Sequence, residues 1–354
     1  MSSRSLKDLP EETVLQIVKH LHTDSIIHKT PEAPIRVDLL QLALCSKRYQ
    51  RITLPFLYHT IHFTGLKVVE RFLNTILEYP TYAPLVKAFD CYGQQQMKPK
   101  PELHGIDFSR IAEIQKLAPD LIQSIKERQE WTYVILLPFL LQNLEELDIE
   151  IDLYPYMRDF GHYFSQMLDK GLVFRKLRSI SWGFALNLGM NLLSSTFLLP
   201  SITRVCIDGW IEFEDTVACH YGTSSVEDLE LRVLTTSEKD MNILLRLPRA
   251  LKKFTWSPTY WEDVAGPILL QGCRRALECV SRSLEFLYFR WRNGFEHFPP
   301  GLEIWSLDNF VSLKTLCINY QLICGRGPNL VLCISNSLPK SLEILVMHSC
   351  YEGP

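Results

Sequence analysis

The chain has 354 residues, and one domain per roughly 150 residues is the usual expectation, so we expect about two domains. Hydrophobic residues make up 47% and charged residues 22%, which is close to globular averages and excludes a disordered or fibrous chain. The 37 basic and 40 acidic residues give a net charge of −3. Because no basic excess is available to neutralise a phosphate backbone, we expect no nucleic-acid partner.

Three further features predict a soluble intracellular protein, in the cytoplasm, the nucleus or both, with no membrane partner. The most apolar stretch, residues 131–141, contains Pro138 and is far shorter than the ~20 residues that cross a bilayer. The N-terminal residues carry Asp8, Glu11 and Glu12 and lack the apolar run of a signal peptide. The ten cysteines form no CxxC pair, which favours free thiols in a reducing compartment.

The first predicted element is a helix that begins at Leu9-Pro10-Glu11-Glu12. Proline at the first helical position and glutamates in the first turn are typical of a helix start. Apolar residues then follow at helical spacing, and the helix is expected to end near His22. A polar loop over residues 23–37 separates it from the next element.

Two more short helices are predicted. Asp38 is an expected N-cap for the second helix, and Ser46 is an expected N-cap for the third, which Pro55 should stop. Three short helices bury little surface, and their apolar residues exceed what so small a core can hide. Surplus apolar surface of this kind indicates a partner or docking on the rest of the chain.

The segments LPEETVLQIVKHL, DLLQLALCSKRYQRI and LPFLYHTIHF together resemble an F-box, over roughly residues 6–63. We therefore expect an F-box domain over residues 1–63. Two departures are a longer loop at 23–37 and Tyr49, where the family most often has tryptophan. The resemblance implies binding to the Skp-family adaptor of a cullin-RING ubiquitin ligase. The positions that match the family, and that this resemblance makes adaptor-binding residues, are Leu9, Pro10, Glu12, Val14, Ile17, Leu21, Leu39, Leu42, Cys45, Tyr49 and Leu57.

A further helix is predicted over residues 66–79, and residues 93–105 are predicted to form an exposed loop because they are polar and carry two prolines. After this loop an apolar-x-x-apolar-x-apolar triplet recurs, with successive copies starting 24 to 33 residues apart. A weaker copy precedes them at residues 85–90. The eight copies are Leu144-Leu147-Ile149, Leu177-Ile180-Trp182, Ile202-Val205-Ile207, Val226-Leu229-Leu231, Leu251-Phe254-Trp256, Leu284-Leu287-Phe289, Leu313-Leu316-Ile318 and Leu342-Leu345-Met347.

The residues that flank the triplets support a true repeat. Serine precedes the first apolar residue in five copies: Ser201, Ser225, Ser283, Ser312 and Ser341. A triplet of this kind at such a period resembles the leucine-rich repeat, in which each repeat supplies one strand and a helical return. Helical returns are expected over residues 238–247 and 268–280. The family's usual Asn or Cys after the strand is met only by Asn293, so the repeats should be irregular.

The expected fold class is therefore α/β: an N-terminal three-helix F-box, followed over residues 64–354 by an irregular leucine-rich-repeat-like α/β solenoid with a parallel sheet. F-box domains followed by such repeats are a common pairing, which strengthens both interpretations.

Candidate groups for catalysis or metal binding are weak. His20 and His22 are two residues apart on a helix and point to different faces, with no cysteine or carboxylate nearby to complete a metal site. No phosphate-binding, nucleophile-elbow or zinc-protease motif is present. We expect no catalytic residue, no metal and no cofactor, and hence no enzyme.

The residues that alternate with the triplets are expected to line the concave face of the solenoid. This face is acidic at Glu146, Asp148 and Glu150 and aromatic with arginine further along the chain. We expect the target-binding residues to be Glu146, Asp148, Glu150, Phe286, Tyr288, Arg290 and Trp291. The competing interpretation is that Phe286 and Tyr288 pack beneath the loop at 291–301.

Three functions remain open from the sequence. The first is the substrate-recognition subunit of an SCF-type (cullin-RING) ubiquitin ligase, whose F-box binds the Skp-family adaptor while the repeats bind an unknown target protein. The second is a non-enzymatic repeat scaffold whose F-box-like segment only caps the solenoid. The third is an enzyme of unrecognised type.

Overall fold

A computed structural model describes residues 9–27, 34–63, 66–93, 131–151, 164, 166, 174–183, 190–209, 220–232, 237–257, 266–290, 305–324 and 337–348. Over these residues the protein is α/β, with ten described strands in one parallel sheet. By its internal contacts the chain divides into two compact units, residues 1–147 and 148–354. The sequence predicts a domain boundary at residue 63, between the N-terminal helices and the repeats. The division by contacts does not test this boundary, which stays a prediction.

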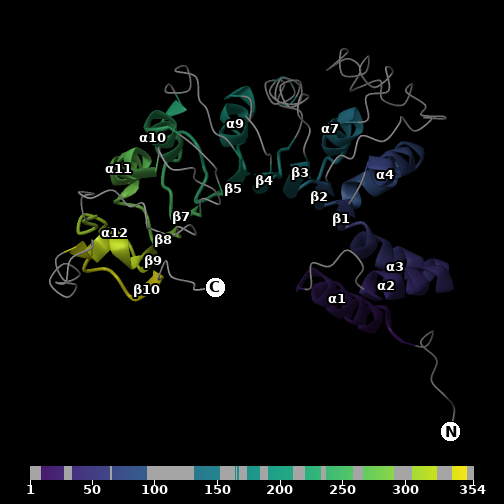
Figure 1. The fold of residues 1–354 in the computed structure, drawn as a ribbon. Coiled ribbons are helices and arrows are strands. Elements are labelled where there is room, and N and C mark those ends of the chain that lie inside the picture. Colours follow the sequence, from purple (N-terminus) through teal and green to yellow (C-terminus); the bar gives the residue numbers. More distant parts are fainter. Residues whose placement is uncertain are drawn as a thin grey trace, which may run out of the picture. The chain divides into compact units, whose positions relative to one another are not determined.

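Three α-helices that contact one another open the first unit (Figure 1). They are α1 (Glu11–Ile27), α2 (Pro34–Cys45) and α3 (Lys47–Leu57). Their shared core consists of Val14, Val18, Leu39, Tyr49 and Ile52, each buried. Ser46 caps α3 as predicted: its hydroxyl accepts a hydrogen bond of 3.2 Å from the backbone N–H of Tyr49.

The boundaries of these helices correct the sequence prediction in three places. α1 does not end near His22 but continues to Ile27, because residues 23–27 contain no glycine or proline to stop the helix. α2 begins at Pro34, so Asp38 lies inside the helix rather than at its N-cap. α3 runs through Pro55 to Leu57, so the proline stands within the last turn of the helix and does not end it.

The remainder of the first unit combines strands with helices. Its elements are β1 (Thr60–Phe63), α4 (Leu66–Glu78), the 3-10 helix η2 (Pro80–Leu85), β2 (Ala88–Gly93) and α7 (Trp131–Leu140). α4 confirms the predicted helix at 66–79, and the strand β2 begins within the weak triplet copy at 85–90. β1 was not predicted as a strand; it pairs in parallel with β2, with Phe63 opposite Cys91. The predicted loop at 93–105 lies, after Gly93, outside the described residues.

Each of the eight predicted triplets coincides with a strand. The strands are β3 (Glu146–Ile151), in which the boundary between the units falls, β4 (Ser179–Gly183), β5 (Arg204–Asp208), β6 (Asp228–Leu231), β7 (Lys253–Trp256), β8 (Phe286–Phe289), β9 (Thr315–Asn319) and β10 (Ile344–His348). Strands follow one another in the sheet in chain order. The triplet residues of β3 to β9 are all buried, whereas Met347 in β10 is 45% exposed, because β10 is the last of the described strands.

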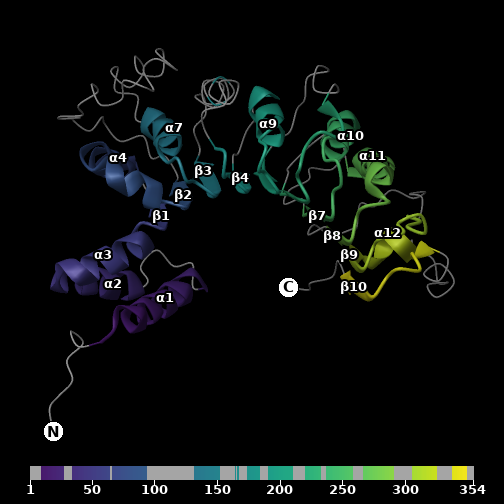
Figure 2. The same cartoon turned by 180° about the vertical axis from the view of Figure 1, so that it is seen from behind.

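In the second unit the helical returns lie on one side of the strands, as Figure 1 and the reverse view in Figure 2 show for α9, α10 and α11. The helices are α9 (Met190–Phe197), α10 (Glu238–Arg246), α11 (Gly266–Leu277), the 3-10 helix η5 (Glu278–Val280) and α12 (Tyr320–Cys324). Elements α10, α11 and η5 confirm the predicted returns. The triplet side of the sheet faces these helices: the Trp182 indole N–H donates to Thr196 Oγ1 in α9 at 3.1 Å.

The serines before the triplets connect each repeat to the preceding one. Ser225 Oγ donates to the carbonyl oxygen of Ile202 at 2.9 Å, and Ser283 Oγ donates to that of Leu251 at 2.8 Å. Ser201 and Ser341 make the same bond to the first triplet residue of the repeat before, and Ser312 donates to the Arg282 carbonyl. These bonds satisfy carbonyl groups just outside the strands, which gives the recurring serine a structural reason.

Candidate functional site

The first candidate surface lies on the N-terminal helices. Val37, Leu40 and Leu44 are 55%, 49% and 73% exposed, and their spacing places them on one stripe of α2. We call these three residues the α2 stripe. Ile17 on α1 is also exposed, at 40%. Large apolar side chains this exposed on a helix whose opposite side is already buried are the usual sign of a partner surface.

The structure divides the predicted adaptor-binding residues into a core and a surface. Val14, Leu39 and Tyr49 are buried in the helix core, and Leu9, Leu21, Leu42 and Leu57 pack against that core while partly buried. Pro10, Glu12, Ile17 and Cys45 are exposed. The α2 stripe was missed by the sequence prediction, although its apolar residues at i, i+3 and i+7 were visible in the sequence.

Polar contacts fasten α3 to the start of α1. The Arg48 guanidinium donates to the Leu9 carbonyl at 2.6 Å, which fixes the chain just before the helix. Arg51 and Glu11 form an exposed ion pair at 2.8 Å, which adds at most about 1 kcal/mol. Among the described residues the buried Tyr49 hydroxyl has no hydrogen-bond partner, so tyrosine is an unfavourable choice at this core position.

The second candidate surface is the side of the sheet opposite α9, α10 and α11, which we call the open face. It consists of the residues that alternate with the triplets in β4 to β9, and the parallel register aligns them in rows across the strands. One row contains Ser179, Arg204, Asp228, Lys253, Phe286 and Thr315, and the next contains Ser181, Cys206, Glu230, Thr255, Tyr288 and Cys317.

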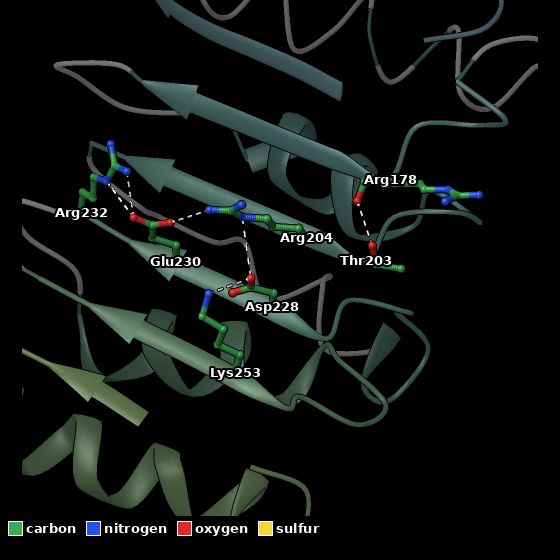
Figure 3. Close-up of polar contacts among 7 residues, drawn as sticks. All are labelled: Arg178, Thr203, Arg204, Asp228, Glu230, Arg232 and Lys253. Atoms are coloured by element: carbon green, nitrogen blue, oxygen red, sulfur yellow. Dashed lines mark hydrogen bonds and ion pairs between the residues drawn. The ribbon is translucent and has the colours of Figure 1, made fainter. Parts of the chain in front are cut away.

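A network of ion pairs crosses the middle of the open face (Figure 3). Arg204 lies 3.1 Å from Glu230 and 3.7 Å from Asp228. Arg232 is 2.9 Å from the other side of the Glu230 carboxylate, and Lys253 is 3.2 Å from Asp228. Hydrogen bonds from the two arginines lower the pKa of Glu230 although burial alone would raise it. The three cations and two carboxylates therefore leave one positive charge in excess, and Arg232 also acts on the neighbouring carboxylates Glu150 and Asp208.

Glu150 of β3 and Asp208 of β5 lie beside this network without a cation within 4 Å among the described residues. Burial raises the pKa of both carboxyl groups; Asp148 and Asp208 raise that of Glu150 further, while Arg232 opposes the shift at both. Gly183 in β4 accommodates the Glu150 side chain, since a Cβ there would lie 2.6 Å from Glu150 Cγ. Glu150 thus extends over β4 toward Asp208, which pairs with Gly183 in the register.

The aromatic end of the open face lies on β8. The Lys253 ammonium group is 5.5 Å from the centre of the Phe286 ring, and the Tyr288 ring meets that of His348 edge to face at 5.9 Å. Phe286, Tyr288 and Arg290 are each partly exposed. Trp291 and the loop at 291–301 lie outside the described residues, so the interpretation that this loop covers the aromatics stays open.

The predicted acidic group is only partly brought together. Asp148 and Glu150 lie in the second unit near Asp208, whereas Glu146 belongs to the first unit, where its backbone N–H donates to the Lys87 carbonyl at 3.0 Å. Asp208 and the cations of the network were not among the predicted site residues. Alternation along each strand predicts that these side chains lie on the open face. Which of them form ion pairs depends mainly on the register between neighbouring strands, and this register cannot be derived from the sequence.

The thiols on the described strands are in their protonated form at neutral pH. Burial raises the pKa of Cys206 to about 11 and that of Cys91 to about 12, and it also raises the pKa of Cys317. A thiol in this state is a poor nucleophile and a poor metal ligand. The cysteines of the open face therefore contribute no reactive thiolate, and the groups available there for binding are the charged and aromatic side chains.

No protein-family model matches the chain, and no curated protein matches it in sequence. In the part of the chain that the structure describes, no helix has the length and apolar character needed to cross a membrane. No cluster of three or more His, Cys, Asp or Glu side chains suited to a metal ion occurs among the same residues.

Proposed function

We propose that this protein is the substrate-recognition subunit of an SCF-type ubiquitin ligase. Helices α1 to α3 bind a Skp-family adaptor, the repeats bind a target protein, and the chain itself catalyses no reaction and needs no metal or cofactor. Its physical contribution is proximity: it holds a target lysine near the ubiquitin thioester carried by another subunit, which raises the effective concentration of the reacting groups. The protein acts inside the cell.

The observation that carries this proposal is the α2 stripe. Val37, Leu40 and Leu44 expose about half or more of their surface to water, while Leu39 on the same helix is 1% exposed and holds α2 to its neighbours. α2 is therefore apolar on two sides, and only one side is used within the helix core. An adaptor that covers the second side would remove this apolar surface from water.

The experiment is a binding titration of the full chain with a Skp-family adaptor. The variant Leu40→Ala/Leu44→Ala truncates two exposed anchors without touching the core and should weaken adaptor binding by about 2–4 kcal/mol. Leu198→Ala/Val311→Ala is the matched control, because these residues are similarly exposed, at 46% and 65%, but lie in the second unit. Wild-type protein that does not bind the adaptor, or a stripe variant that binds like the control, contradicts the proposal.

A scaffold that uses its helices only as a cap is the second candidate. It is favoured by contacts at the end of α3, where the Tyr58 ring lies 4.8 Å from Tyr82 and 6.2 Å from Phe72 of α4. These contacts attach the helices to the start of the sheet without any partner. The titration separates the two functions, because a cap needs no affinity for the adaptor.

A further inference from the structure

We propose that the open face binds an extended segment of the target protein that carries one basic side chain four or five residues from an apolar side chain. The basic side chain lies between Glu150 and Asp208, and the apolar side chain lies against Phe286 and Tyr288. This binding does not require the adaptor. The inference rests on the proposed ligase function only where it treats the bound protein as a target of ubiquitination.

Charge complementarity specifies the basic side chain. The described cations of the network, Arg204, Arg232 and Lys253, are each within 3.2 Å of Asp228 or Glu230. Glu150, which is exposed, and Asp208, which is partly buried, have no such partner among the described residues, and partial loss of solvation raises the pKa of both. A lysine or arginine from a partner would restore the lost solvation of both carboxylates, whereas an acidic or neutral side chain would not.

The spacing follows from the strand geometry. β5, which carries Asp208, and β8, which carries Tyr288, are three strand steps apart in the sheet. Strands lie about 4.8 Å apart, so the distance across them is roughly 14 Å. The register aligns Tyr288 with Cys206, two residues before Asp208, which adds roughly 7 Å along the strands and makes the direct separation roughly 16 Å. An extended segment advances about 3.3 Å per residue. A segment that crosses the strands therefore needs four or five residues to reach from the carboxylates to the aromatic rings.

The apolar contact follows from partial exposure at β8. Phe286 and Tyr288 point to the open face, while Leu287 and Phe289 of the same strand are buried on the triplet side. Cys317 on β9 stands next to Tyr288 in the register and extends this weakly polar area. Aromatic side chains that are half covered already lose little conformational freedom on binding.

The test uses the full chain with a fluorescent label and an array of dodecapeptides in a Gly/Ser background. Each peptide contains one Arg and one Phe, separated by one to eight positions, and a second array has Glu in place of Arg. Binding to the Arg peptides should peak at a separation of four or five and should be at least tenfold weaker for the Glu peptides. A flat dependence on separation, equal binding of both arrays, or no binding to either array overturns the proposal.

Variants connect the array signal to the open face. Glu150→Gln/Asp208→Asn and, separately, Tyr288→Ala should reduce binding at the optimal separation at least tenfold. The matched control is Glu238→Gln/Glu278→Gln, which makes the same change in net charge on α10 and η5, on the helix side of the sheet. If the control loses as much binding as the open-face variants, the signal reflects overall charge and the proposal fails.

Two separate measurements keep folding and the ligase function apart from this result. The double variant at Glu150 and Asp208 removes two carboxylates whose pKa is raised in the folded state, so its melting temperature at pH 7 should be at or above that of wild type. Adaptor binding, measured on the same preparations, depends on the α2 stripe and should be unchanged. Peptide binding without adaptor binding would reject the ligase proposal but not the peptide-binding proposal. Adaptor binding without peptide binding would reject the peptide-binding proposal but not the ligase proposal.

Discussion

His59 lies between α3 and β1, where its environment opposes protonation. Burial lowers its pKa below the ordinary value of 6.5, Glu145 and Glu146 act in the opposite direction, and Lys87 adds to the lowering. Its ring is 4.9 Å from that of His22 on α1, and its Nδ1 is 3.1 Å from the Thr60 hydroxyl. A proton on His59 is therefore better accommodated in the unfolded chain than in the folded one.

This environment predicts a pH dependence of stability. The folded-state pKa of His59 lies below its unfolded value of about 6.5. The folded protein therefore has its full stability, as far as His59 is concerned, above about pH 6.5, and it loses stability as the pH falls below that value. The free energy of unfolding, measured with urea from pH 7.5 to pH 5.5, should decrease, and His59→Gln should make the decrease shallower. His20→Gln, at an exposed position of α1, is the control. A slope that His59→Gln leaves unchanged would contradict this assignment.

At the residue scale, the sequence predicts on which side of the sheet a residue lies, but it does not predict which residues form ion pairs. Alternation correctly placed Asp148, Glu150, Phe286 and Tyr288 opposite the buried triplet residues. The partners of Glu230 could not be predicted, because Arg204 is 26 residues away and reaches it only through the strand register. Exposure of the α2 stripe likewise depends on which side of α2 the other two helices use.

At the scale of the element the strands were predicted better than the helices. A triplet on a strand has one buried side at a fixed period of two, so the sequence marks both its place and its orientation. Helix ends are predictable where a local signal marks them. Ser46 is a strong local cap and was predicted, whereas no glycine or proline marks the end of α1, which was therefore placed too early. β1 was missed although Tyr58, Ile61 and Phe63 follow the triplet spacing, because the F-box resemblance had already assigned these residues to the N-terminal domain.

The serine bonds between repeats give the prediction that belongs to this scale. Ser225→Ala removes a hydrogen bond of 2.9 Å to the Ile202 carbonyl and should lower the free energy of unfolding by about 1 kcal/mol. Ser283→Ala should behave alike, because its bond to Leu251 has the same geometry. The control is Ser281→Ala, whose hydroxyl donates only to Glu278 in its own turn. Urea unfolding that shows no difference between Ser225→Ala and Ser281→Ala would remove the structural reason for the recurring serine.

At the scale of the molecule, the α/β class and the parallel sheet follow from the period of the triplets. A strand every 24 to 33 residues leaves room for a helical crossover, and such crossovers make parallel neighbours. The point at which the sheet begins could not be predicted. The F-box resemblance predicts a domain boundary after residue 63, and this stays a prediction; Thr60–Phe63, just before it, is the first of the described strands of the sheet.

The position of β1 determines how the chain can be divided. Its four residues pair with Ala88–Cys91, and the backbone N–H groups of Lys87 and Ala88 both donate to the His59 carbonyl, at 2.8 and 2.9 Å. The Phe63 ring is 5.5 Å from that of Phe89 and 5.4 Å from that of Phe72. A fragment 64–354 therefore loses the edge strand β1 and exposes Phe89. A fragment 59–354 keeps β1 and the contact that covers Phe89.

Since repeats depend mainly on their neighbours, fragment 59–354 should remain folded and monomeric without the N-terminal helices. Fragment 64–354, only five residues shorter, should melt at a lower temperature and associate, because it presents an unpaired β2 edge beside newly exposed aromatic surface. Thermal unfolding together with light scattering distinguishes the two. Equal melting temperatures and equal masses would mean that β1 contributes nothing to the sheet, and the boundary would then return to residue 63.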